Sequence, residues 1–379
     1  MNPLLPFNRP PLVGRELENL GDVLQRRELA GNGLYTRICQ DWLKTRLGVA
    51  EALLTQSCTA ALEMAAILCG LGPGDEVIMP SFTFVSTANA VVLRGAVPVF
   101  VDVRQDTLNI DERLIEGAVT PRSKAIFVVH YAGVPCEMDA VNEIARRYGL
   151  VVVEDAAQAL LSTYNGRQTG VLGDIACFSF HESKNVVSGE GGALVTKRSD
   201  FADRAHVLWE KGTNRRAFLK GAVDKYTWID IGSSFLPSEL TAAFLAAQLQ
   251  NADEITRDRL ATWKFYDRAF AELERRSNQI VRPVVPTTVT HNGHLYYLLL
   301  RHGTSRDAVI ERLRADGIVA PFHYVPLHSS PAGVQFCRTS GSLAVTDDVA
   351  TRLIRLPLWY RMGSLADQVV EAVSREVLR

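Results

Sequence analysis

Short apolar runs alternate with segments of helical pattern over the first half of the chain. Three segments predict helices: 59–69, 84–94 and 138–148. Four short apolar runs lie beside them and predict strands: 76–79, 98–101, 125–129 and 150–153. Because these runs lack polar alternation, we expect strands that are buried on both faces. The alternation of strands and helices predicts an α/β fold, with a mostly parallel sheet flanked by helices.

The pattern changes after residue 173. Two short strands, 176–180 and 193–196, are predicted on either side of a glycine-rich stretch. The remaining predicted elements are a long helix over 239–276, with an interruption left open, a strand at 296–300, and helices at 306–316 and 368–377. This division predicts a large α/β domain over 1–245, which includes the N-terminal segment, and a smaller C-terminal α+β domain over 246–379.

Composition and charge exclude several classes of protein. The 379 residues are 47% hydrophobic and 22% charged, and the formal net charge of -1 favours neither nucleic acid nor an anionic membrane as partner. The longest apolar runs are too short to cross a bilayer, and residues 1–11 lack an apolar core of signal-peptide length, so we expect a cytoplasmic protein. The six cysteines form no C-x-x-C pair, and no metal site or disulfide framework is predicted.

One lysine stands in a position that favours covalent chemistry. Lys184 follows the predicted strand 176–180 and precedes the glycine-rich stretch 188–192. A lysine at a strand exit near buried surface can have a lowered pKa, which makes its amine a competent imine former. Taken alone, a loop lysine is more often simply solvated.

An acidic pair lies at the carboxyl end of the apolar strand 150–153. Glu154 and Asp155 follow this strand, with Gln158 one helical turn further on. Open α/β sheets bind ligands at this edge, and a buried carboxylate there needs a cationic partner. The protonated nitrogen of a pyridine ring would serve, and the pairing would strengthen the ring as an electron sink. The alternative is that Asp155 only caps the following helix.

Two further segments agree with a bound pyridine cofactor that carries a phosphate. Small residues at 57–60 begin a predicted helix, where backbone N–H groups and the helix dipole favour an anion. Phe84 follows a strand end and is placed to stack on a flat ring. The alternatives are an ordinary capped helix and a phenylalanine packed in the core. The joint occurrence of all four features, in this order, favours the cofactor site.

These residues belong to a pattern that resembles a known family, the DegT/DnrJ/EryC1/StrS sugar aminotransferases, within the fold type I enzymes that use pyridoxal 5′-phosphate (PLP). The resemblance runs from 6–8 to 356–358. It is strongest in these segments: 72–77, 82–89, 130–133, 154–158, 178–181, 184–185 and 189–192.

The resemblance implies a role for each candidate residue at the cofactor. Lys184 would hold PLP as a Schiff base and move the proton during catalysis, and Asp155 would pair with the pyridine nitrogen. The other implied contacts are Gln158 near the phenolic oxygen of the ring, Phe84 stacked on the ring, and Thr59, Ala60 and Ser179 at the phosphate. Pyridoxamine 5′-phosphate is the implied intermediate form of the cofactor.

The family resemblance also implies a homodimer in which each subunit completes the site of its partner, with a tetramer left open. Many members carry a Gly-Tyr-Asn run whose asparagine reaches the phosphate in the partner. This chain has Gly-Ser-Ser at 232–234. Ser234 is therefore expected in the place of that asparagine.

Further segments resemble the members that form dTDP-4-amino-4,6-dideoxygalactose for surface polysaccharides: 211–215, 224–228, 230–234 and 322–328. The implied reaction transfers the amino group of L-glutamate to a nucleotide-linked 4-keto-6-deoxy sugar, dTDP-4-keto-6-deoxyglucose. A sugar diphosphate needs cationic or N–H donors. Five residues in these segments are candidates for that site: Lys211, Arg215, His323, Tyr324 and His328. The gluco epimer or another amino-sugar nucleotide is left open as the product.

Three other functions are weighed against transamination. A PLP-dependent sugar dehydratase of the same fold carries histidine in place of the lysine, and Lys184 is present here. A nicotinamide-dependent oxidoreductase needs G-x-G-x-x-G between a strand and a helix, whereas the glycines at 70–74 follow a helix and precede a strand. A scaffold protein without cofactor is disfavoured because Lys184, Asp155 and Gln158 occur together.

Overall fold

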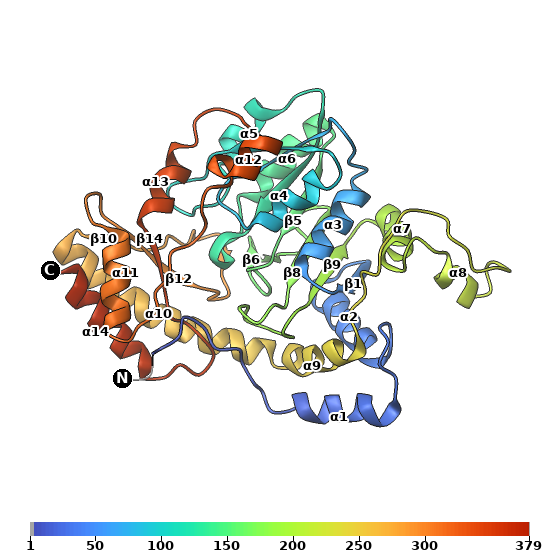
Figure 1. Ribbon diagram of the computed structural model, residues 1–379, viewed down its shortest axis with the longest axis horizontal. Helices are drawn as coiled ribbons and strands as arrows, with labels where there is room; N and C mark the ends of the chain where they lie inside the picture. Colours follow the sequence, from blue (N-terminus) through green and yellow to red (C-terminus); the bar gives the residue numbers. More distant parts are fainter. Residues whose placement is uncertain (1–3, 379) are drawn as a thin grey trace.

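The computed structural model describes residues 4–378, which are built around an eight-stranded sheet (Figure 1). The strand order is β1-β9-β8-β5-β4-β2-β3-β13. Strand β9 runs antiparallel to both neighbours, and the other neighbouring pairs are parallel. The strands are β1 (Glu51–Thr55), β2 (Glu76–Pro80), β3 (Val97–Val101), β4 (Ser123–Val129), β5 (Val151–Asp155), β8 (Ile175–Ser179), β9 (Gly192–Thr196) and β13 (Arg338–Thr339). The sheet is mostly parallel, as the apolar runs predict.

Helices cover both faces of this sheet because successive strand residues point to opposite sides. In β4, Phe127 packs in one core cluster with α3, whereas Val128 packs in another with α6. The first face is covered by α3 (Cys58–Leu68), α4 (Val85–Val92) and α7 (Ser199–Trp209). The second face is covered by α2 (Leu34–Leu47), α5 (Glu112–Ala118), α6 (Met138–Tyr148) and α9 (Glu239–Gln250), with α1 (Glu16–Arg26) outside α9. The predicted α/β fold class is confirmed.

A second core lies at the C-terminal end of the chain. The predicted long helix is interrupted at Asn251, and α10 (Ala252–Ser277) runs from the end of α9 into this second core. The other elements there are β10 (Ile280–Val281), β12 (Tyr296–Leu300), β14 (Leu353–Leu356), α11 (Arg306–Ala315) and α14 (Leu365–Val377). The three strands form a small sheet in the order β10-β12-β14.

Two segments connect the cores across the predicted boundary at residue 245. Near the N-terminus, Leu5 packs in the second core and pairs with Ile318. Near the C-terminus, β13 joins the edge of the large sheet, where Arg338 forms ion pairs with the buried Glu76. The intervening chain between the second core and β13 includes η2 (Leu327–Ser329) and α12 (Pro331–Phe336), and α13 (Ala344–Arg352) follows β13.

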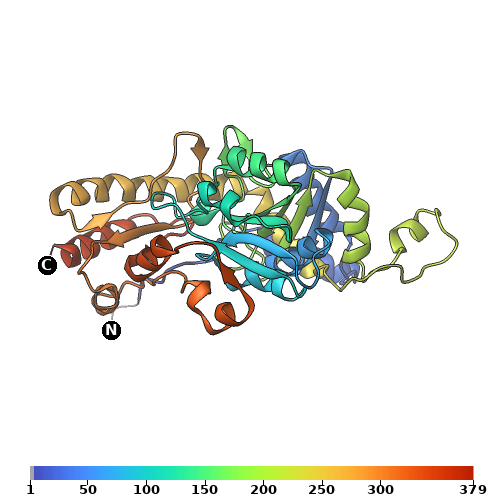
Figure 2. The same ribbon diagram turned by 90° about the horizontal axis from the view of Figure 1, so that it is seen from above.

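The remaining elements are peripheral. A second small sheet consists of β6 (Thr163–Tyr164), β7 (Arg167–Gln168) and β11 (Val289–Thr290), and η1 (Tyr131–Gly133) is a short turn of helix. The segment that carries α8 (Arg215–Leu219) projects away from the body of the molecule (Figure 2). Among the described residues, no helix has the length and hydrophobicity needed to span a membrane.

Candidate active site

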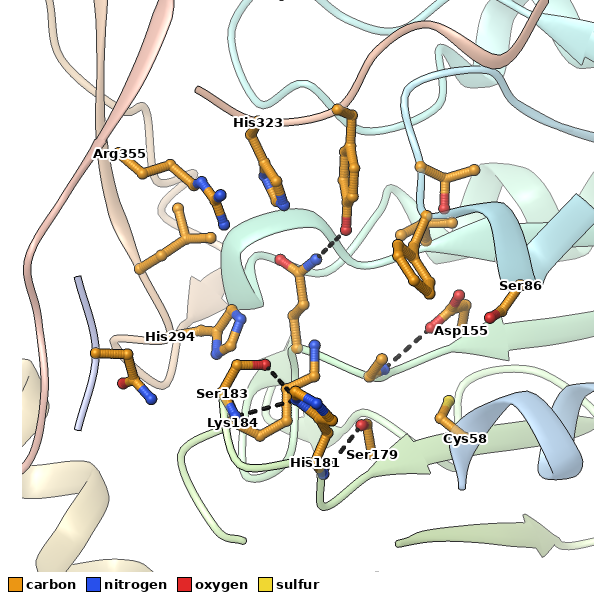
Figure 3. Close-up of a pocket in the computed structure, with 18 of the residues that line it drawn as sticks. Cys58, Ser86, Asp155, Ser179, His181, Ser183, Lys184, His294, His323 and Arg355 are labelled. Atoms are coloured by element: carbon orange, nitrogen blue, oxygen red, sulfur yellow. Dashed lines mark hydrogen bonds between the residues drawn. The ribbon is translucent and has the colours of Figure 1, made fainter. Parts of the chain in front are cut away.

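A cavity of about 620 Å³ lies between the carboxyl ends of the parallel strands and the C-terminal core (Figure 3). The N-terminal wall of the cavity is formed mainly by Thr59, Phe84, Asp155, Gln158, Ser179 and Lys184. The C-terminal wall is formed mainly by Arg259, His294, His323, Tyr324 and Arg355. The position agrees with the edge at which open α/β sheets bind ligands. Eight of the residues predicted from the sequence therefore meet in one cavity.

Lys184 lies in the loop after β8, where its backbone N–H donates to the His181 carbonyl at 2.9 Å. Its amine has no hydrogen bond or ion pair with the described residues. Burial lowers the pKa of Lys184, and the nearby Arg355 charge lowers it further, while Cys58 and Asp155 act in the opposite direction. A lower pKa gives a larger fraction of neutral, nucleophilic amine.

Asp155 is the last residue of β5 and is buried, with 5% of its surface exposed. The Thr87 hydroxyl donates to its Oδ2 at 2.7 Å, and the Ala157 N–H donates to its Oδ1 at 3.1 Å. The carboxylate forms no ion pair with any residue that the structure describes. Burial raises the pKa of Asp155, and the hydrogen bonds from Thr87 and Ala157 and the charges of Lys184 and His130 offset this only in part. A protonated pyridine nitrogen is the partner that this carboxylate lacks, so the site fits PLP.

The start of α3 approaches the glycine-rich strand β9 closely. Ser57 caps the helix, and its Oγ accepts a hydrogen bond from the Ala60 N–H at 3.1 Å. A Cβ on Gly192 would lie 2.5 Å from the Cys58 nitrogen, so only glycine allows this approach. Thr59 lines the cavity, and its hydroxyl is 2.7 Å from that of Ser86. Ala60 does not line the cavity, and its N–H is already used within the cap.

Gln158 joins the two walls through its side-chain amide. Its Oε1 accepts from the Ala132 N–H at 2.8 Å, and its Nε2 donates to the Tyr324 hydroxyl at 2.8 Å. Tyr324 has a φ of 30°, a backbone conformation that non-glycine residues rarely adopt. A strained backbone of this kind persists only where surrounding contacts hold it in place, and such residues are concentrated at functional sites.

His323 stacks on Tyr324 with ring centroids 3.6 Å apart, and its Nδ1 is 2.8 Å from the Tyr131 hydroxyl. Burial lowers the pKa of His323 well below its usual value, and the charges of Arg355 and Lys184 add to this effect. Burial also raises the pKa of Tyr131, which keeps the phenol protonated. We assign the phenol as donor to Nδ1, which leaves the imidazole neutral with its proton on Nε2.

The last two predicted cofactor residues lie at the rim and floor of the cavity. Phe84 precedes α4 and is 57% exposed, so it is not packed in the core. Ser179 is the last residue of β8, and its Oγ accepts from the His181 N–H at 3.4 Å. The exposed ring of Phe84 is available to a ligand in the cavity.

Besides Ala60, four predicted residues do not line the cavity in this chain. Arg215 begins α8 in the projecting segment and pairs with Glu210 at 3.6 Å. Lys211 and Ser234 lie at the two ends of that segment, where the Ser234 carbonyl accepts a hydrogen bond from the Gln56 side chain. His328 follows the C-terminal wall but points elsewhere. Its Nδ1 is 2.9 Å from the Ser81 hydroxyl, and its Nε2 is 3.2 Å from Asp347. In the structure, His328 is therefore a packing group whose ring nitrogens are both satisfied.

The sequence did not single out five residues that line or support the cavity: Cys58, Thr87, Arg259, His294 and Arg355. Thr87 is the third residue of α4, and no feature of the sequence marks its contact with Asp155. Arg355 stands in an otherwise apolar strand, which is the one local feature that marked it. The contacts of the other three depend on elements that are far apart in the chain.

The model of the DegT/DnrJ/EryC1/StrS aminotransferase family matches residues 12–374. The chain belongs to this aminotransferase family. Among curated relatives, the chain is 36% identical to GDP-perosamine synthase of Caulobacter vibrioides over 87% of this chain and 86% of that protein. It is 33% identical to the spore coat polysaccharide biosynthesis protein SpsC of Bacillus subtilis, over 100% of this chain and 98% of that protein.

Solved structures of the family include both forms of the cofactor. The PLP form of the putative sugar aminotransferase Spr1654 from Streptococcus pneumoniae superposes with a TM-score of 0.89 and 26% identity, covering 99% of this chain and 100% of that chain. The pyridoxamine-phosphate form of the same protein superposes with a TM-score of 0.90. The chain is thus a PLP-dependent sugar aminotransferase, with pyridoxamine 5′-phosphate as its intermediate form.

Proposed function

We propose that this aminotransferase moves the amino group of L-glutamate to the C4 ketone of a nucleotide-linked 4-keto-6-deoxy sugar. The observation that carries the proposal is the placement of Lys184 and Asp155 in one cavity, with a free amine and a buried carboxylate that lacks a cation. When bound, PLP supplies an electrophilic imine carbon and a protonated ring that accepts electrons.

Three residues of the N-terminal wall divide the chemistry between them. Asp155, held by Thr87 and the Ala157 N–H, would keep the pyridine nitrogen protonated. Lys184 would take the proton from the donor carbon and return it at the sugar carbon, because its lowered pKa leaves a larger fraction of the amine neutral and able to accept a proton. Gln158 has its amide fixed at both ends and is placed to orient the phenolic oxygen of the ring.

Phosphate binding is proposed at the start of α3. The Thr59 hydroxyl and the Ser179 hydroxyl face the cavity there, and the helix dipole favours an anion at this end. The Ala60 N–H donates to Ser57 in this chain, so its proposed contact needs that cap to rearrange. Phe84 would cover one face of the ring from the cavity rim.

The sugar nucleotide is proposed to be dTDP-4-keto-6-deoxyglucose, with dTDP-4-amino-4,6-dideoxygalactose as product, in the synthesis of a surface polysaccharide. The support is the resemblance of segments 211–215, 224–228, 230–234 and 322–328 to family members with that activity. The names of GDP-perosamine synthase and SpsC indicate related roles in the family. His323 and Tyr324 are in the cavity and are proposed to contact the sugar.

A homodimer with shared sites is proposed from the projecting segment. Lys211, Arg215 and Ser234 do not line the cavity of their own chain, and the segment between Lys211 and Ser234 exposes Tyr226 and Trp228. An isolated subunit gains nothing from exposing such groups to solvent. In a dimer, this segment would reach the partner cavity and bring its cations to the diphosphate.

The decisive experiment uses the purified protein loaded with PLP. We expect a visible absorbance band that L-glutamate bleaches and that borohydride fixes as a pyridoxyl group on Lys184, located by mass spectrometry of peptides. The Lys184→Ala variant should lose at least about 10,000-fold in turnover, since both covalent attachment and proton transfer depend on its amine. Lys197→Ala, at an exposed lysine of the same domain, is the matched control and should keep full turnover.

The substrate is tested with a panel of keto-sugar nucleotides and NMR of the aminated product. A protein that binds PLP at Lys184 but aminates none of the panel would contradict the proposed substrate class. An active Lys184→Ala variant would contradict the proposed mechanism.

A further inference from the structure

Arg355 presents an unpaired guanidinium group to the cavity. Its Nε and Nη2 donate to the Phe322 carbonyl oxygen at 3.2 and 2.8 Å, and its Cζ lies 4.5 Å from the centre of the Phe7 ring. These contacts fix the direction of the group. No carboxylate among residues 4–378 forms an ion pair with it, and its Nη1 has no hydrogen-bond partner there.

The hydrogen bonds used by Arg355 leave a fork of N–H groups free. A guanidinium group has five N–H donors, and the Phe322 carbonyl occupies one on Nε and one on Nη2. Both N–H groups of Nη1 and the second one of Nη2 remain, at the end of the side chain. This end matches the two oxygens of a carboxylate, with which arginine forms parallel hydrogen bonds.

Arg355 lies beside two histidines whose pKa values are lowered by burial and which are therefore neutral, on the side of the cavity opposite Asp155. Figure 3 shows Arg355, His294 and His323 on one side of the cavity and Asp155 on the other. Arg259 adds a second buried guanidinium, which donates to the carbonyls of Gly293 and His294 and has no acidic partner within ion-pair distance in the described chain. A buried positive charge without a partner is costly, and a bound anion removes that cost.

Arg355 and Lys184 line the same cavity, so an anion bound to Arg355 would share the cavity with the reactive amine. The Arg355 charge is close enough to lower the pKa of Lys184, of His294 and of His323. Two anionic substrates, the amino donor and the sugar nucleotide, enter this cavity in the proposed reaction. In an amino acid the carboxylate is on the carbon that carries the amine, whereas in a 4-keto sugar nucleotide the diphosphate is across the sugar ring from the reacting carbon. An anion site beside Lys184 therefore suits the carboxylate.

We propose that the free end of Arg355 binds the α-carboxylate of the amino donor, with Arg259 and His294 supporting it from behind. This inference rests on the proposed function, because it assumes that an α-amino acid delivers the amino group. It adds a donor site on β14, on the opposite wall from the groups proposed to hold the cofactor. Arg355 thereby becomes a specificity determinant for the amino donor.

The test compares binding of two unreactive anions by calorimetry, with the PLP-loaded protein. Glutarate stands for the amino-acid donor, and dTDP stands for the nucleotide. Arg355→Gln should weaken glutarate binding about 30-fold and leave dTDP binding within about twofold of the wild type, since charge-assisted hydrogen bonds to one anion are lost. The Michaelis constant for L-glutamate in the bleaching reaction should rise by a similar factor.

Two further variants keep the test informative. Arg355→Lys retains the charge without the fork, so glutarate binding should weaken only about fivefold, and this variant replaces Arg355→Gln if that protein fails to fold. Arg275→Gln removes an exposed arginine paired with Glu272 and should change neither ligand.

Each alternative outcome overturns the proposal. Loss of dTDP binding with unchanged glutarate binding would assign Arg355 to the diphosphate instead. Unchanged binding of both anions would make Arg355 a packing residue. Failure of the proposed function looks different, because glutarate would still bind and depend on Arg355 while no keto-sugar nucleotide was aminated.

Discussion

The two walls of the cavity differ in the ionisable side chains that they contain. The N-terminal wall contains the buried acid Asp155 and the amine of Lys184, both on or next to the ends of central strands. The C-terminal wall contains Arg259 and Arg355, which have no acidic partners among residues 4–378. Asp155 in the first wall forms no ion pair with the described residues, and neither do the two arginines of the second wall. This difference teaches that the site is complementary to a cationic ring on one side and an anionic substrate on the other.

The contacts that hold each wall in place differ as well. On the N-terminal wall, Asp155 accepts two hydrogen bonds from its own domain, and its strand is central in the sheet. On the C-terminal wall, Tyr324 has a strained backbone and depends on Gln158 from the other wall. The N-terminal wall is therefore built by the sheet itself, whereas the C-terminal wall is completed only when the two cores pack together.

The largest effect is expected at Asp155, which defines the N-terminal wall. Asp155→Ala should lower turnover about 1,000-fold with PLP bound, because the ring loses the group that keeps its nitrogen protonated. Turnover with saturating PLP measures this. Asp200→Ala, at an exposed aspartate paired with Arg198, is the control and should be unaffected. A loss of less than about tenfold would remove Asp155 from the proposed role.

A smaller effect concerns the attachment of the C-terminal wall to the sheet. The pKa of Glu76 is lowered to about 2, mainly by the hydrogen bond from Arg338 on β13, with Thr120 and Arg122 contributing. A lowered carboxyl pKa stabilises the fold above the ordinary glutamate pKa of 4.5, and that stability is lost as the pH falls towards 2.

Glu76→Gln should therefore lower the free energy of unfolding at pH 7 by about 2 kcal/mol, after allowance for the exposed arginine partners. The difference between variant and wild type should shrink when the pH falls below 4.5. Urea unfolding at about pH 7 and about pH 3.5 provides the measurement. Glu63→Gln is a useful control, because burial raises the pKa of Glu63 and its loss should not destabilise the protein at pH 7. Equal stability of Glu76→Gln at both pH values would contradict this account.

The smallest effect is expected at the contact between the walls. Tyr324→Phe removes the hydroxyl that accepts from Gln158, so kcat/KM should fall about tenfold, equivalent to one hydrogen bond. Steady-state kinetics with saturating PLP would detect this. Tyr148→Phe, which removes an exposed hydroxyl bound to Glu116, should leave kcat/KM unchanged. If both variants keep the kcat/KM of the wild type, the hydrogen bond between Gln158 and Tyr324 does not contribute to catalysis.

Local sequence patterns predicted most of the large sheet but not its edges. The apolar runs of β2 to β5 are buried on both faces, and such runs carry their own signal. Strand β1 precedes the first element that the pattern predicts, and β13 has two residues that pair with β3 from far along the chain. Such edge strands are defined by their partners, so no local pattern marks them.

The same distinction holds for the site. Lys184, Asp155 and Gln158 follow strands whose ends must meet at one edge of a parallel sheet, and this placement is why the sequence pattern singles them out. His328 lies only four residues after Tyr324, yet its ring binds Ser81 and Asp347 outside the cavity. A motif places residues near one another in the chain, and it does not determine the direction of each side chain.

By itself, the sequence indicated the fold class, because buried strands and their ends follow from the local hydrophobic pattern. The resemblance to the aminotransferase family, together with those strand ends, indicated the PLP chemistry and the candidate residues of the N-terminal wall. Only the tertiary structure decided that Arg259, His294 and Arg355 face Lys184 across one cavity, and that Thr87 supports Asp155. These contacts join residues far apart in the chain. Their positions depend on how the second core packs against the sheet. The spacing of hydrophobic residues within one segment does not determine that packing.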